Sequence, residues 1–140
     1  MLSNSQMVEI MLFYRDFSIS NGVPTSYFDG FEERLKSLFR SNDTRSLEKG
    51  MRDLPALVSA IRSEEAKYRF LAEFSEKFGF SFSSILLDLE RRSKRIIKSG
   101  RIKDSVEAEI LRAYLDMIEV NKERSEDRNL AAALLECYKP

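Results

Sequence analysis

The stretch at residues 70–97 constrains the fold most, because it consists of two helical patterns separated by one glycine. In the first pattern, apolar residues recur at spacings of three and four, which places them on one helical face. Gly79 follows, where a residue without a Cβ readily ends a helix in the left-handed conformation. The second pattern ends in the same way at Gly100. Since two helices joined by a short turn usually pack side by side, we expect a central antiparallel helical hairpin over about residues 64–99.

Phenylalanines gather around the turn of this predicted hairpin. A packed aromatic side chain buries on the order of 150 Å² or more, so a cluster of this size favours a hydrophobic core. The sequence therefore predicts that the hairpin is the main packing unit of the chain. The phenylalanines concerned are Phe70, Phe74, Phe78, Phe80 and Phe82.

Helical periodicity extends over the rest of the chain, and no stretch alternates in the way a half-buried strand does. Gly30 is expected inside the second helix, and Pro55 is expected to begin a fourth helix, because proline suits a first helical turn. We predict a compact all-α bundle of six to eight helices in a single domain over residues 1–140. The further helices are expected near residues 7–17, 25–40, 45–54, 55–61, 104–122 and 125–138, and loops near 18–24, 40–44, 79–83, 99–104 and 124.

Composition and net charge limit the partners and the cellular location that we expect for this chain. The chain has 140 residues, the length of one domain, and its 23 basic and 23 acidic residues cancel. Global charge therefore favours neither nucleic acid nor an anionic membrane surface. The N-terminus lacks the pattern of a secretory signal, and the longest apolar run, residues 10–14, is far below the ~20 residues that span a bilayer. With a single cysteine, Cys137, we expect a cytoplasmic protein without membrane contact.

The residue types that usually carry catalysis are scarce. Histidine is absent, which removes the commonest general base and the commonest metal ligand. No glycine-rich phosphate loop, dinucleotide fingerprint, nucleophile elbow or calcium-loop motif occurs. Adjacent carboxylates such as Glu64 and Glu65 point in different directions on a helix. We therefore predict a protein that is not an enzyme, with no catalytic residue, no metal site and no cofactor.

A run of basic residues without any acidic one is the strongest candidate site. Three of its members, Arg91, Arg95 and Lys98, fall on one helical face. The sequence leaves five explanations open: stabilisation by the helix dipole, pairing with the acidic helix at 104–123, plain solvation of the run, binding of an acidic protein, and binding of nucleic acid. The candidate partner-binding residues are Arg91, Arg92, Lys94, Arg95, Lys98, Arg101 and Lys103.

The first predicted helix is apolar around nearly its whole circumference. Such a helix is either buried by its own chain or shared with a partner. The sequence leaves both interpretations open, including a homodimer. The residues expected at an oligomer or partner contact are Met7, Met11, Tyr14 and Phe17.

These features favour a non-catalytic protein-binding module of the adaptor, inhibitor or toxin-immunity type, acting through a charged or apolar helical surface. Another protein is the expected partner, with an acidic protein as one possibility. One alternative is a nucleic-acid-associated regulator that uses the basic run at 91–103, which is disfavoured because exposed aromatics are not interleaved with the cations. Another is a self-associating structural subunit that uses the apolar first helix.

Overall fold

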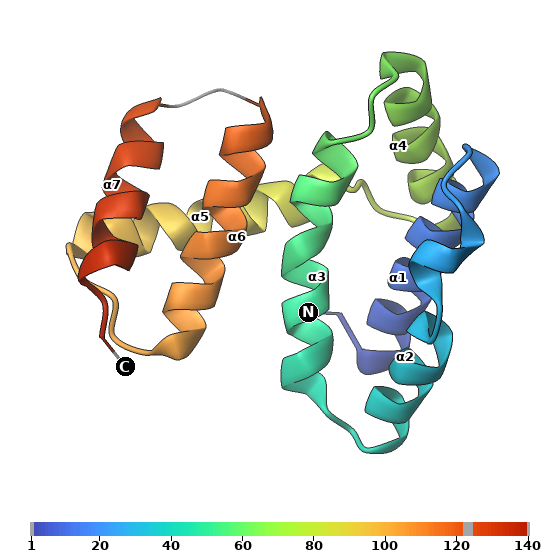
Figure 1. Ribbon diagram of the computed structural model, residues 1–140, viewed down its shortest axis with the longest axis horizontal. Helices are drawn as coiled ribbons and strands as arrows, with labels where there is room; N and C mark the ends of the chain where they lie inside the picture. The colour runs from blue at the N-terminus through green and yellow to red at the C-terminus, as the bar shows by residue number, and fades with distance from the viewer. Residues whose placement is uncertain (1, 122–124, 140) are drawn as a thin grey trace. The chain divides into compact units, whose positions relative to one another are not determined.

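Seven α-helices and one 3₁₀ turn form the regular structure of the computed structural model, which describes residues 2–121 and 125–139 (Figure 1). No strand occurs within these residues, so the predicted all-α class and helix number are confirmed. The loop expected near residue 124 lies outside the described residues. The elements are α1 (Asn4–Ser20), η1 (Thr25–Phe28), α2 (Phe31–Arg40), α3 (Thr44–Ser59), α4 (Glu64–Phe78), α5 (Ser83–Ser99), α6 (Ser105–Asn121) and α7 (Ser125–Cys137).

The chain divides into two compact units, Met1–Leu54 and Pro55–Pro140. In the first unit, α1 packs against α2. In the second, α6 packs against both α5 and α7, and α5 also contacts α7. A single domain over residues 1–140 stays a prediction.

A capping box begins α1. The Ser3 hydroxyl accepts a hydrogen bond from the Gln6 amide at 3.1 Å, and Gln6 Oε1 accepts one from the Ser3 amide at 2.8 Å. These two bonds satisfy backbone donors that the first helical turn leaves free. The helix runs to Ser20, beyond its predicted end near residue 17.

Gly30 does not lie inside a helix, so that prediction is wrong. Its φ angle is +76°, in the left-handed region, and it stands between the 3₁₀ turn and the start of α2. A side chain there would be strained, whereas glycine adopts this conformation readily. The glycine therefore separates two elements that the sequence pattern had merged.

Pro55 does not begin a new helix either, because α3 continues through it to Ser59. Proline lacks an amide hydrogen and so cannot bond to the carbonyl of Met51, one turn earlier. The buried residues Leu47, Met51, Leu54 and Val58 nevertheless follow one helical stripe on both sides of it. Burial of this continuous stripe therefore stabilises the helix by more than the missing hydrogen bond at Pro55 destabilises it.

Asp43 caps the start of α3. Its carboxylate accepts hydrogen bonds from the Ser46 hydroxyl at 2.8 Å and from the Ser46 amide at 3.1 Å. Both bonds favour the ionised form, the hydroxyl bond most, and they hold the pKa of Asp43 below its ordinary value of 3.8.

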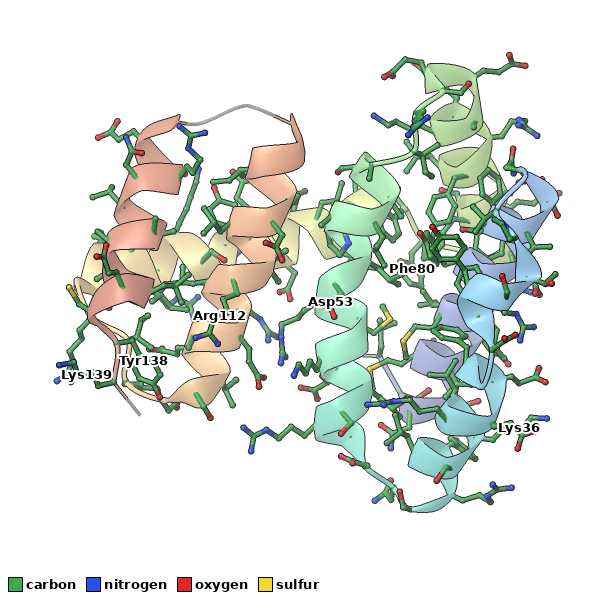
Figure 2. All side chains as sticks on the ribbon, in the orientation of Figure 1. Lys36, Asp53, Phe80, Arg112, Tyr138 and Lys139 are labelled. Atoms are coloured by element: carbon green, nitrogen blue, oxygen red, sulfur yellow. The ribbon has the colours of Figure 1, made fainter. Side chains whose placement is uncertain are left out.

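The aromatic cluster predicted around Gly79 is confirmed. Phe70, Phe74 and Phe82 are fully buried. The ring of Phe82, just before α5, stands edge-on to both Phe70 and Phe74, with centroids 5.3 and 5.2 Å apart. Phe80, labelled in Figure 2, lies edge-on to Phe74 at 5.3 Å. The rings thus join the end of α4 to the start of α5.

The most extensive packing of α5, however, is with α6 and α7 rather than along α4. Figure 1 shows α6 and α7 side by side across α5. A hydrophobic cluster fills the space between these three helices, so the aromatic residues around Gly79 are not the only core of the second unit. The buried members of this cluster are Leu89, Ile96, Ile110, Leu111, Ala113, Tyr114, Met117, Ile118 and Ala131.

Two polar side chains lie in or beside this cluster. Tyr114 on α6 is fully buried, and its hydroxyl donates a 2.8 Å hydrogen bond to Asp127 Oδ2 on α7. Ser93 on α5 is also fully buried, but its hydroxyl has no hydrogen-bond partner among the described residues. The Tyr114 hydroxyl links α6 to α7, whereas the Ser93 hydroxyl is buried without a hydrogen bond among the described residues.

We expect Tyr114→Phe to lower the free energy of unfolding by about 1.5–3 kcal/mol, because it leaves the partly buried Asp127 carboxylate without this donor. Urea denaturation followed by circular dichroism measures the change. Tyr68→Phe is the matched control, since Tyr68 is 76% exposed. Equal stability of the two variants would contradict the role of the Tyr114–Asp127 bond.

Ser93→Ala is expected to raise the free energy of unfolding by about 1 kcal/mol, because burying an uncompensated hydroxyl is unfavourable. Part of any gain comes from the higher helix propensity of alanine. Ser75→Ala, at an exposed position of α4, measures that part separately. A gain at residue 93 no larger than that at residue 75 would show that the hydroxyl finds a partner.

The cap at Asp43 predicts a pH dependence in acid. Because the pKa in the folded state is depressed, the ionised carboxylate stabilises fully above pH 3.8, and the contribution is lost as pH falls through the folded value. Asp43→Asn keeps a capping side chain that does not titrate. The difference in unfolding free energy between wild type and Asp43→Asn should be constant above pH 3.8 and shrink below it. Asp29→Asn serves as the control, and an identical pH profile for both variants would contradict the prediction.

Candidate functional site

The candidate site lies on the side of α5 that points away from its packed partners. Three buried residues, Leu89, Ser93 and Ile96, mark the inward side of this helix. With 3.6 residues per turn, residues 91, 94, 95 and 98 fall on the opposite side. Gly100, with a φ angle of +76°, ends the helix just after this group.

All seven basic residues predicted as the site are exposed. Five of them belong to α5, and Arg101 and Lys103 follow in the connection to α6. Arg91, Lys94, Arg95 and Lys98 form one continuous outward surface, which we call the basic face. Arg92 lies at its edge.

Two cations are neutralised within the helix itself. Arg92 Nε lies 3.1 Å from Asp88 Oδ2, and Lys94 Nζ lies 3.0 Å from Glu90 Oε1. Both pairs join residues four apart, the spacing that brings side chains together on a helix. Because all these side chains except Glu90 are about half exposed, each pair contributes little, on the order of 0–1 kcal/mol.

The expected pairing with the acidic helix is not seen for the remaining cations of the basic face. Among the side chains that the structure describes, Arg91, Arg95 and Lys98 make no ion pair. Two acidic groups at the start of α6 instead accept hydrogen bonds from backbone amides at the N-terminus of this helix. Asp104 Oδ1 accepts a 2.9 Å hydrogen bond from the Glu107 amide, and Glu107 Oε1 accepts one of 2.9 Å from the Lys103 amide.

An exposed leucine lies next to these cations. Leu87 is 56% exposed and precedes Arg91 by one helical turn. Leu87 was not among the residues predicted for the site from the sequence. Its spacing from the basic residues was the available signal, but only the structure gives its exposure.

The residues predicted at an oligomer contact lie mostly inside the first unit. Met7, Met11 and Phe17 are 3%, 4% and 7% exposed, and Tyr14 is half-buried with its ring edge-on to Phe28 at 6.3 Å. These four side chains therefore do not form an open surface in this structure. The prediction of a homodimer stays a prediction.

Met11 packs especially closely against α3. A Cβ built on Gly50 would lie only 2.7 Å from Met11 Sδ, so the glycine makes room for the methionine. This contact accounts for a glycine in the interior of α3, where alanine is intrinsically preferred.

Other parts of the chain supply few groups for chemistry. Among the described residues, no three His, Cys, Asp or Glu side chains gather in a way that could hold a metal ion. No helix in the same part of the chain combines the length and apolar character of a membrane span. Cys137, the single cysteine of the chain, is exposed.

Comparison with known proteins gives no family. No family model matches the chain, and neither a curated protein nor a solved structure matches it.

Proposed function

We propose that this protein is a non-catalytic protein-binding module whose contact surface is the basic face of α5. The observation that carries the proposal is the presence of Arg91, Arg95 and Lys98 on one exposed face without an ion pair among the described residues. An acidic protein surface would supply the missing counter-charges.

Local helix energetics explains only part of this arrangement. Arg91 and Arg95 are four residues apart, and Arg95 and Lys98 are three apart, so like charges are neighbours. Each such pair is unfavourable by about 0.2–0.5 kcal/mol. The helix dipole favours a cation by about 0.3–1 kcal/mol, but only within the last turn, which contains Lys98 alone. Arg91 and Arg95 gain nothing comparable from their own helix.

A protein partner is favoured over nucleic acid by two features. The formal net charge of the chain is zero, so no global field attracts a polyanion. In addition, α5 carries no aromatic residue on which a base could stack. Self-association through the apolar first helix has less support, because Met7, Met11 and Phe17 are buried.

The expected biological setting follows from this chemistry. Adaptors, inhibitors and toxin-neutralising proteins act by occupying a partner's surface, and separated charge sets their association rate and choice of partner more than their raw affinity. We expect this protein to work in that manner in the cytoplasm.

Reversal of the three unpaired cations tests the proposal. The variant Arg91→Glu/Arg95→Glu/Lys98→Glu should lose at least about 90% of the protein partner that the wild type recovers, because attraction becomes repulsion. The measurement is affinity purification from the source cells at low salt, with quantitative mass spectrometry and absorbance at nucleic-acid wavelengths.

The control variant Arg34→Glu/Lys49→Glu/Arg62→Glu makes the same change in net charge at exposed positions that do not belong to α5. Thermal melts of both variants identify any loss of folding. Equal recovery of the partner by both variants would refute the basic face as the contact. Recovery of nucleic acid by the wild type, with a log–log salt slope near −0.9 per neutralised phosphate, would favour the regulator instead.

A further inference from the structure

Leu87 shares the outward side of α5 with the basic face. On a helix, residues 87, 91, 94 and 98 repeat at spacings of four, three and four, the pattern of one continuous stripe. Leu87 is 56% exposed, and all three basic residues of the stripe are exposed. The outer stripe of α5 is therefore apolar at its first position and cationic afterwards.

The stripe has a defined length and order. At 1.5 Å per residue, Leu87 and Arg91 are about 6 Å apart along the helix axis, and Leu87 and Lys98 about 16 Å. A single exposed leucine is ordinary on a protein surface. An exposed leucine in line with Arg91 and Lys98, which make no ion pair among the described residues, is more specific, because one ligand segment has to satisfy both kinds of group.

Resting on the proposed function, we infer that the partner contributes an acidic amphipathic helix that packs along this stripe. An aliphatic or aromatic side chain of that helix covers Leu87. Carboxylates of the partner helix lie against Arg91 and Lys98 of the stripe and against Arg95 beside them. They follow the residue that covers Leu87 by one to three helical turns. Two helices that cross at a small angle stay in contact over this length, which matches the run of the stripe.

Other anionic ligands fit the stripe less well. A phosphate backbone offers Leu87 no apolar surface, and the stripe has no aromatic ring for base stacking. A lipid surface would bury a broad apolar face, whereas only Leu87 is apolar on this side of the helix. An acidic helix with one apolar anchor offers a partner to Leu87 and to Arg91 and Lys98, the two cations of the stripe that make no ion pair among the described residues.

A designed peptide of about 20 residues tests the inference directly. The probe is a fluorescent helical peptide with one leucine flanked by glutamates on the same face, and its partner probe has serine in place of that leucine. Fluorescence anisotropy at low salt measures binding of each probe to the full chain. We expect the leucine probe to bind about tenfold more tightly than the serine probe.

Variants of the protein separate the contribution of the Leu87 side chain to binding from that of the basic residues. Leu87→Ser should weaken binding of the leucine probe about tenfold and leave the serine probe unaffected. Arg91→Glu/Arg95→Glu should weaken both probes at least about tenfold. The matched controls are Leu130→Ser, at a leucine that is 45% exposed on α7, and Arg34→Glu/Lys49→Glu, and neither should change the affinity.

The outcomes separate this inference from the proposed function. If charge reversal weakens binding but Leu87→Ser does not, the apolar anchor is refuted and the basic face stands. If neither probe binds, or if neither set of variants changes binding, both are refuted. Tighter binding to duplex DNA or to phosphatidylserine vesicles than to the leucine probe would likewise overturn both.

Discussion

Burial of one side of α5 against α6 and α7 is the constraint on which the candidate site depends. Leu89 and Ile96 belong to the hydrophobic cluster that these helices share. Because side chains project from a helix at fixed angles, burying this side fixes the rotation of α5 about its axis. The same rotation turns Arg91, Arg95 and Lys98 outward. The basic face is thus a product of core packing and not of any contact among the cations.

The hydrogen bonds that hold α6 and α7 do not involve the basic face of α5. The Tyr114 hydroxyl ties α6 to α7 through Asp127, and Asp104 and Glu107 are engaged at the start of α6. The acidic groups that satisfy local hydrogen bonds are therefore not the ones that neutralise the basic face. The structural roles and the proposed binding role therefore fall to different charged residues.

Prediction from sequence succeeded where a single local rule decides the structure. Gly79 and Gly100 end helices in the left-handed conformation, as their positions indicated. Gly30 has the same conformation but precedes a helix, and composition does not distinguish the two uses. Pro55 was assigned to a helix start because its missing amide is harmless there, but tertiary burial kept the helix continuous. For the site, the charges were found by periodicity, whereas the exposure of Leu87 and the missing ion pairs depend on packing between distant segments.

The close contact between Gly50 and Met11 links two positions that are far apart in the chain. Since a Cβ at residue 50 would meet Met11 Sδ at 2.7 Å, a side chain at position 50 is accommodated only if the flexible end of Met11 shifts or is shortened. A larger residue at position 50 would therefore fit best beside a shorter side chain at position 11, and related chains could vary the two positions together. Such paired variation would let α1 and α3 be recognised as neighbours from an alignment alone, and it would give this fold a signature by which distant relatives can be found.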